Sequence, residues 1–162
     1  MGLSESDTPF THGHEGGEAW FGLLNAHERF ITKVDKALQA EHNLPLTWFE
    51  VLLRLMIDNP SEDGFMSVSR IAGSVLLSPS RVSRVVGGLE GRGLLERRRG
   101  ERDARVSEVA LTEQGRDLYR AADATHRRVV NEIFLDKLSA EEAAVMARVW
   151  GRLQLLGVGE AS

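Results

Sequence analysis

The stretch of sequence that decides the fold runs from Ser67 to Gly115: SVSRIAGSVLLSPSRVSRVVGGLEGRGLLERRRGERDARVSEVALTEQG. Its pattern predicts a short helix, a turn, a second helix, a charged hairpin and the start of a third helix. Nine arginines and no lysine lie between Arg70 and Arg105, against four acidic residues, so this window carries about +5. The whole chain carries −4. A cationic surface on an acidic protein is typical of a protein that binds a phosphate backbone.

The second helix of this stretch is predicted over residues 78–92, and its two faces differ in chemistry. Ser78 suits the N-cap, and Pro79 suits the first helical position. Valine and leucine form one face, and the opposite face carries Ser80, Arg81, Ser83 and Arg84. Because arginine reads guanine edges and serine adapts to a base or a phosphate, we predict that this face enters the major groove of DNA. The alternative is a solvated face with ordinary surface arginines.

A hairpin is predicted over residues 94–111, with strands at 94–98 and 106–111 around a charged tip. Its arginines are Arg97, Arg98, Arg99, Arg102 and Arg105. Several arginines at such a tip can follow the DNA backbone, and one can enter a narrow minor groove. The alternative is a soluble charged turn. The use of arginine alone argues against that alternative, because a solvating loop has no need of a planar guanidinium.

Further helices are predicted on both sides of this stretch, because apolar residues recur there at helical spacing. Before it, we expect one helix over 18–41 and a second from a Thr47–Glu50 capping box to about residue 59. After it, Thr112 is expected to cap a long helix, and a Ser139–Glu142 capping box is expected to open the last one. The outer helices carry apolar faces that one winged domain cannot cover, so we expect a homodimer.

Length and composition narrow the class of protein. A chain of 162 residues suits one domain, and residues 1–17, rich in glycine, are expected to form a flexible tail. We expect no signal peptide and no membrane contact, because no basic segment followed by an apolar one opens the chain and no apolar run is long enough to span a bilayer. The absence of cysteine removes disulfides and thiol chemistry and favours a cytoplasmic location.

Three motifs together carry a family resemblance. They are LEGRGLLER at Leu89–Arg97, Asp103-Ala104-Arg105, and LTEQG at Leu111–Gly115. The last two resemble the D-x-R … L-T-x-x-G signature of the MarR (multiple antibiotic resistance regulator) family of winged helix-turn-helix transcription factors, at the right spacing. The resemblance covers about residues 18–156.

The resemblance implies a mainly α fold with a small β-hairpin wing (α+β), in which residues 18–157 form a single domain. Residues 46–112 would be the winged helix-turn-helix that binds DNA. The helices in 18–45 and 113–157 would form the dimerisation region. The implied function is that of a homodimeric transcriptional regulator, most simply a repressor, bound to a pseudo-palindromic operator. The alternative is a winged-helix module for protein–protein interaction that does not bind DNA.

The family pattern also implies roles for single residues. Asp103 would brace the wing and Arg105 would reach the minor groove. Ala104 departs from the pattern, because many relatives carry an arginine there, and Arg102 is the residue that would compensate. The predicted DNA-binding residues are Ser69, Arg70, Ser78, Ser80, Arg81, Ser83, Arg84, Arg97, Arg98, Arg99, Arg102, Asp103 and Arg105.

Relatives often bind small aromatic acids between the dimer helices and the winged domain, which implies an effector site here. The predicted ligand-binding residues are Trp20, His27, Trp48, Phe49 and Arg54. The alternative for Trp20 and Phe49 is a place in the core or the dimer interface, and Glu50 is interpreted as the partner in the capping box.

No catalytic residues are predicted, because no set of nucleophile, base and orienting group stands out, so we expect no enzyme. His27, His42 and His126 offer no pair at His-x-x-x-His spacing and no cysteine accompanies them, so no metal or other cofactor is expected.

Overall fold

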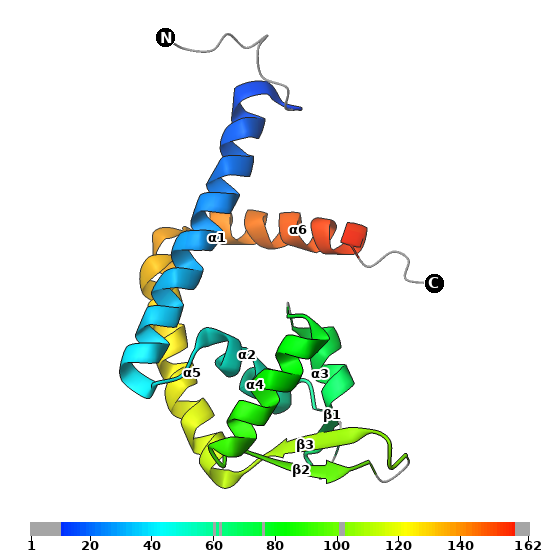
Figure 1. Cartoon of the computed structure of the whole chain (residues 1–162). Coiled ribbons are helices and arrows are strands. Elements are labelled where there is room, and N and C mark those ends of the chain that lie inside the picture. Colours follow the sequence, from blue (N-terminus) through cyan, green and yellow to red (C-terminus); the bar gives the residue numbers. More distant parts are fainter. Residues whose placement is uncertain (1–10, 60, 62, 76, 101–102, 158–162) are drawn as a thin grey trace.

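The structure is a computed structural model that describes residues 11–59, 61, 63–75, 77–100 and 103–157. Within them the chain is mainly helical with one small sheet, which confirms the predicted fold class (Figure 1). The elements are α1 (Gly13–His42), α2 (Leu46–Ile57), β1 (Met66–Ser67), α3 (Val68–Ser74), α4 (Pro79–Gly91), β2 (Leu95–Arg99), β3 (Ser107–Leu111), α5 (Glu113–Ile133), a 3-10 turn (Leu135–Lys137) and α6 (Ala140–Gly157).

Helices α2, α3 and α4 and the sheet enclose most of the core, and α1 and α5 add buried residues to it, among them Leu38 and Ala122. The apolar face of α4 is buried there as predicted, with Val82, Val86 and Leu89 fully inaccessible to solvent. The strands are antiparallel in the order β1-β3-β2, and β2 and β3 form the predicted hairpin. The sequence analysis did not predict β1, because two residues are too short to show an alternating pattern.

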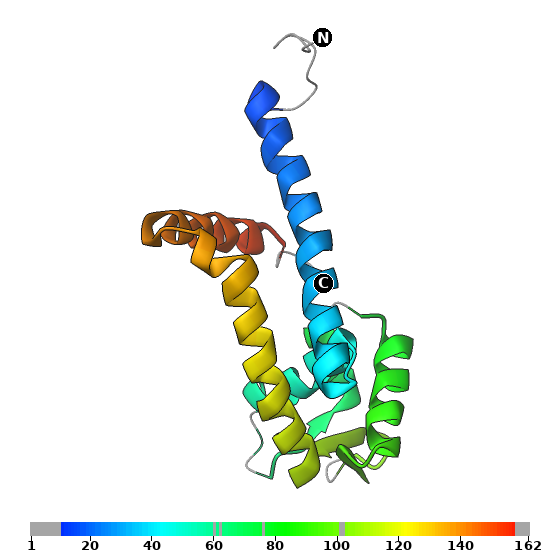
Figure 2. The ribbon, with the colours of Figure 1, turned by 90° about the vertical axis from the view of Figure 1, so that its left-hand side faces the viewer.

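Helices α1 and α5 run side by side and connect the winged region to α6 (Figure 2). Near the end of α1 the buried Thr125 hydroxyl donates a hydrogen bond to Glu41 Oε2 at 2.8 Å. This hydrogen bond, more than the neighbouring Arg128, lowers the pKa of Glu41. On the other side, His42 Nε2 lies 2.8 Å from the same hydroxyl. The contact therefore ties the first helix to the fifth through polar groups as well as apolar ones.

Helix α1 begins at Gly13 rather than at the predicted Glu18, so the prediction of a flexible tail is wrong for residues 13–17. Gly17 is buried, and Glu15 in the first turn is well placed for the helix dipole. The many glycines of this segment masked its helical character. The remainder of the predicted tail, residues 1–10, lies outside the described residues.

The capping box predicted at Thr47–Glu50 is wrong. Helix α2 already begins at Leu46, with Pro45 at the N-cap, and no side chain of the cap residue caps it. Instead Asp35 of α1 accepts a hydrogen bond from the Leu46 backbone N–H at 2.8 Å. A carboxylate from a neighbouring helix therefore caps α2 in place of the predicted local capping box. Glu50 faces a pocket.

Other predicted helix ends are confirmed. The Thr112 hydroxyl accepts from Gly115 N–H at 3.0 Å, and Ser139 and Glu142 cap each other reciprocally at 2.8 and 3.2 Å. Helix α4 ends as expected near Gly93, whose φ of +71° suits glycine. At the start of α3 the Ser67 hydroxyl accepts from the Arg70 N–H at 3.2 Å.

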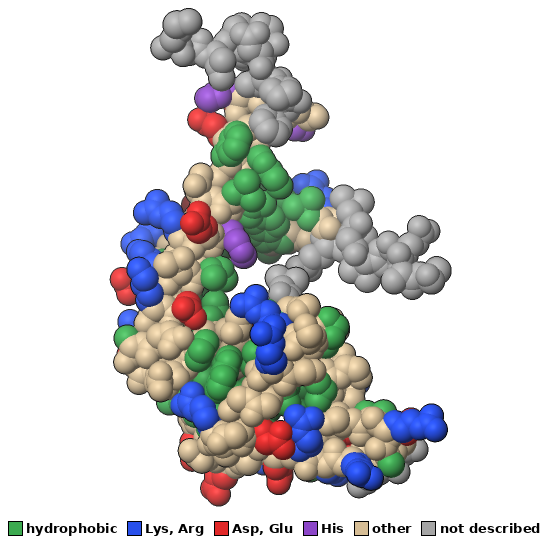
Figure 3. All heavy atoms as spheres, in the orientation of Figure 1, with side chains coloured by type: hydrophobic (Ala, Val, Ile, Leu, Met, Phe, Trp, Pro, Cys, Tyr) green, Lys and Arg blue, Asp and Glu red, His purple; other side chains and the backbone are tan. Residues whose placement is uncertain are grey.

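An apolar surface lies where α1 passes α6, away from the winged region (Figure 3). The exposed large apolar residues of α1 and α6 include Trp20, Phe21, Leu24, Val145 and Leu153, each more than 40% accessible. None of the described helices is both long enough and apolar enough to cross a membrane.

Candidate nucleic-acid interface

Helix α4 presents the predicted polar face to solvent. Its apolar side chains are held in the core, and the other side of the helix therefore has to face outward. The exposed residues of its first two turns include Ser80, Arg81, Ser83 and Arg84. Ser78 lies just before the helix, with its Oγ 3.3 Å from Ser80 Oγ. Among the described residues, neither Arg81 nor Arg84 has an ion-pair partner, so both guanidinium groups are available to an anion.

The start of α3 adds to the same polar region. Ser69 and Arg70 are exposed there, and Ser69 Oγ lies 3.2 Å from Ser67 Oγ. The Ser67 hydroxyl caps the helix by accepting a hydrogen bond from the Arg70 backbone N–H, and this bond fixes the first turn of α3. The short helices α3 and α4 lie next to each other (Figure 1).

The tip of the wing is braced by Asp103. Its carboxylate Oδ1 accepts a hydrogen bond from the Arg105 backbone N–H at 2.9 Å, and its carbonyl accepts from Val106 N–H at 3.0 Å. Gly100 closes the turn by donating to the Val106 carbonyl at 2.9 Å. The Arg105 and Arg99 side chains are left exposed by this turn. Arg102 lies outside the described residues.

Two wing arginines bind groups of the protein itself. Arg97 donates to Glu90 at 2.9 Å and to the Ser107 hydroxyl at 2.6 Å. Arg98 has the more enclosed position: it contacts Asp63 at 2.6 Å and Glu108 at 2.9 Å. Both arginines were predicted to contact DNA, and the structure shows what each contacts within the chain.

Arg98 also lies over the ring of Phe65, with its guanidinium carbon 3.9 Å from the ring centre. The pKa of Asp63 is lowered first by a hydrogen bond from the Phe65 backbone N–H and then by Arg98. These contacts join the loop before β1 to the wing, and the sequence analysis missed them. The Arg98–Glu108 pair follows from the hairpin register, in which the two residues are directly opposite, but Asp63 and Phe65 gave no local signal.

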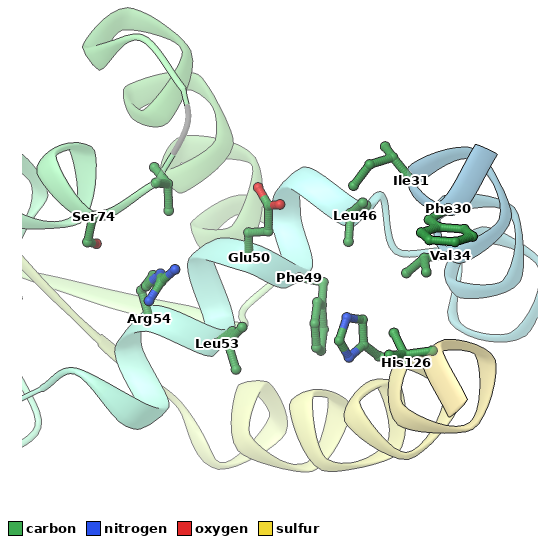
Figure 4. Close-up of a pocket in the computed structure, with 12 residues that line it drawn as sticks. Phe30, Ile31, Val34, Leu46, Phe49, Glu50, Leu53, Arg54, Ser74 and His126 are labelled. Carbon is green, nitrogen blue, oxygen red and sulfur yellow. The ribbon is translucent and has the colours of Figure 1, made fainter. Parts of the chain in front are cut away.

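A pocket of about 280 Å³ lies between α1, α2 and α5 (Figure 4). Phe49 and His126 stack in it with ring centres 4.9 Å apart. Burial lowers the pKa of His126. Burial also raises the pKa of Glu50, and the positive charge of the nearby Arg54 opposes this rise. Arg54 also donates to Asp58 at 3.0 Å. The sequence analysis missed Glu50 and His126 as pocket residues, because the former was interpreted as a cap.

The structure separates the five residues predicted to bind a ligand. Only Phe49 and Arg54 line this pocket. Trp20 is 48% exposed on the apolar surface of α1, and His27 lines a different hollow beside Phe134 and Trp150. Trp48 packs against α4 instead. Among the described residues, no group of three or more histidines and acids is placed to hold a metal ion.

A helix-turn-helix built from α3 and α4, followed by a hairpin with an arginine-rich end, defines a winged helix-turn-helix protein (Figure 1). The model of the MarR family matches residues 42–106, which contain this unit. Residues 42–106 thus match the MarR family of transcriptional regulators, in agreement with the predicted resemblance. A family of transcriptional regulators also agrees with the prediction that the chain is not an enzyme.

The chain is similar to several known proteins. It is 32% identical over 89 residues to the uncharacterized HTH-type transcriptional regulator YdgJ of Bacillus subtilis, and the match spans about half of each protein, 55% of this chain and 54% of YdgJ. The structure of AbsC, a MarR family regulator from Streptomyces coelicolor, is 25% identical with a TM-score of 0.83, covering 94% of this chain and all of AbsC. Sco3205 from the same organism, solved in complex with DNA, is 22% identical with a TM-score of 0.83, covering 96% of this chain and 94% of that one.

Proposed function

We propose that this protein is a homodimeric transcriptional repressor that binds a pseudo-palindromic DNA operator. The observation that carries the proposal is the α4 face, where Arg81 and Arg84 are exposed without an ion-pair partner among the described residues. A helix anchored on one side and cationic on the other suits the major groove. The wing residues Arg99 and Arg105 would contact the backbone or the minor groove. Sco3205, which shares the fold, has been solved with DNA.

Within this proposal Arg98 braces the wing instead of contacting DNA. Its guanidinium is already occupied by two carboxylates and an aromatic ring, and moving it to a phosphate would leave Asp63 and Glu108 without their partner. Arg97 is less enclosed and remains a candidate for a phosphate contact. A cytoplasmic location fits this function and stays a prediction.

The first experiment recovers duplexes bound by the protein from a randomised pool and measures affinity for the recovered sequence at several salt concentrations. We expect a two-fold symmetric site with half-sites about 10 bp apart, as two recognition helices on one face of DNA require. Affinity should fall steeply between about 50 and 200 mM salt, because arginine–phosphate contacts release counterions. A protein–protein interaction module, the alternative function, would enrich no sequence and show no such dependence.

The homodimer is proposed from the apolar surface formed by α1 and α6. Exposed patches of this kind mark interaction sites, and a second copy of the chain offers the same surface. Leu153→Glu, in α6, should convert the dimer to a monomer in light scattering. Ile57→Glu is the matched control, because Ile57 is more exposed (59% against 49%) but lies at the end of α2 in the winged region. A dimer that survives Leu153→Glu would locate the interface elsewhere.

A second proposed function is control by a small aromatic acid, and the pocket around Phe49 is the observation that favours it. Its lining is mostly apolar with one cation, Arg54, which holds Asp58 through one nitrogen and keeps other donors for a carboxylate. The carboxylate of Glu50, which lines the same pocket, would repel an anion bound beside Arg54. The volume suits a ligand of one ring.

Salicylate and 4-hydroxybenzoate are the probes for this site. Calorimetry should show binding that Arg54→Met weakens and Glu50→Gln strengthens, because the first removes the attraction for the carboxylate and the second removes the repulsion. Both acids should release the recovered duplex. If neither acid binds at millimolar concentration, the pocket does not take aromatic acids.

A further inference from the structure

The indole of Trp48 lies directly against the backbone of α4. A Cβ built on Gly88 would be 2.6 Å from both Cη2 and Cζ2 of Trp48, closer than real Cβ atoms come to a neighbour. Only glycine leaves room for the ring at this position. The backbone of Trp48 is held in the first turn of α2, where its backbone N–H donates to the Pro45 carbonyl at 2.9 Å. The benzo edge of the indole therefore sets how close α4 comes to the start of α2.

Arg92 adds a second contact at the same end of α4. Its guanidinium carbon lies 5.6 Å from the centre of the Trp48 ring, and its NH1 donates to the Asn43 carbonyl at 3.0 Å. Asn43 ends α1 in a left-handed conformation, with φ of 49°. The C-terminal end of α4 is thus held to the corner between α1 and α2 by a ring, a cation and a hydrogen bond.

We infer that Trp48 is a positioning residue for the recognition helix, which it places through Gly88 and Arg92. The inference rests on the proposed DNA-binding function. Gly88 is one turn beyond Arg84, about 6 Å along the helix axis. A bidentate contact to a base tolerates only a few tenths of an ångström. A displacement of α4 by about 1 Å at Gly88, enough to admit a methyl group beside the indole, would therefore misplace Arg84 in the groove.

The core contacts of α4 do not prevent this displacement. Val82, Val85, Val86 and Leu89 bind the helix to the core along one side, which keeps the helix folded and docked. They do not occupy the space between Gly88 and the indole. We therefore expect a shifted α4 in a folded protein, with DNA recognition affected more than stability.

The experiment compares Gly88→Ala with Gly91→Ala. Gly91 is on the same helix, farther from the proposed groove contacts, and a Cβ there would meet nothing within 4 Å. The probe is a duplex recovered from a randomised pool by the wild-type protein. Incorporated 5-fluorotryptophan gives a ¹⁹F resonance for Trp48, assigned with Trp48→Phe, that reports its surroundings without DNA.

We expect Gly88→Ala to stay folded, to shift the Trp48 resonance and to weaken duplex binding by about tenfold, the loss of one base contact. Gly91→Ala should change neither. Trp48→Phe removes the ring atoms that clash, so the double variant Gly88→Ala/Trp48→Phe should regain affinity to within a few-fold of the wild type. A packing defect alone would not be repaired by a second truncation.

Wild-type affinity in Gly88→Ala, an unmoved Trp48 resonance, or no recovery in the double variant would each overturn the inference. Should Gly88→Ala not fold, Trp48→Phe alone decides, because it leaves a gap beside Gly88: severalfold weaker binding supports the inference and unchanged binding refutes it. Failure of the proposed function has a different signature, since the wild-type protein itself would then enrich no duplex, and the inference would fall with it.

Discussion

Replacing Gly115 by alanine should destabilise the protein, because the new methyl group would overlap the backbone just before β2. A Cβ on Gly115 would be 2.1 Å from the Leu94 carbonyl oxygen and 3.2 Å from Leu111 Cδ2. The obstacle is a backbone atom, which no rotamer change can move. The same oxygen accepts a hydrogen bond from Thr112 N–H at 3.1 Å. The glycine of the LTEQG motif is thus explained by the contact between the start of α5 and the wing.

The expected change in the free energy of unfolding is the sum of destabilising terms and one stabilising term. The start of α5 has to move by about 1 Å, and forced overpacking of this kind costs roughly 1–3 kcal/mol. Weakening the Thr112–Leu94 hydrogen bond adds about 1 kcal/mol. Alanine recovers up to about 1 kcal/mol of helix propensity relative to glycine. The net expectation is a loss of about 2 kcal/mol, or about 4–8 °C in Tm for a chain of this size.

The assay is denaturant and thermal unfolding at one fixed protein concentration, since dimerisation makes Tm depend on concentration. Gly73→Ala is the matched control: Gly73 is helical in α3, and a Cβ there would meet nothing within 4 Å. It should leave stability unchanged or raise it by less than about 1 kcal/mol. Equal stability of Gly115→Ala and Gly73→Ala would refute the reasoning.

Three further predictions concern DNA binding and pH. Arg84→Ala should cost about 1–3 kcal/mol for the recovered duplex and relax base preference at one position of each half-site, as selection from the pool with the variant would show. Arg99→Ala should weaken all duplexes alike and reduce the slope of log affinity against log salt by about one; a change of sequence preference would contradict a backbone contact. Burial lowers the pKa of His126 below 6.5, so the unfolded chain takes up this proton at higher pH than the folded one, and stability should fall as the pH drops below 6.5. His126→Gln should flatten this fall in unfolding curves between about pH 7.5 and 5.5, and an unchanged slope would show that other groups cause it.

Local signals in the sequence were sufficient for most of the winged region. The Ser78-Pro79 pair located the start of α4, Thr112 located the start of α5, and the alternating residues on either side of the charged tip located the hairpin. These features act over three or four residues, through a cap or a turn, and the chain folds them the same way in most surroundings. The arginine-rich α4 face follows from helical periodicity once the apolar face is buried.

Tertiary structure decided which distant groups meet. Thr47 and Glu50 had the spacing of a capping box, yet Asp35 from the preceding helix caps α2 instead, because packing brings a carboxylate to Leu46 N–H. The hairpin register pairs Arg98 with Glu108, but the second carboxylate, Asp63, reaches Arg98 only through the packing of the loop before β1. Contacts of this kind depend on the packing of helices far apart in the chain, which no window of sequence contains. The sequence therefore determined the elements and the cationic surface, while their packing determined which side chains brace that surface and which remain open to DNA.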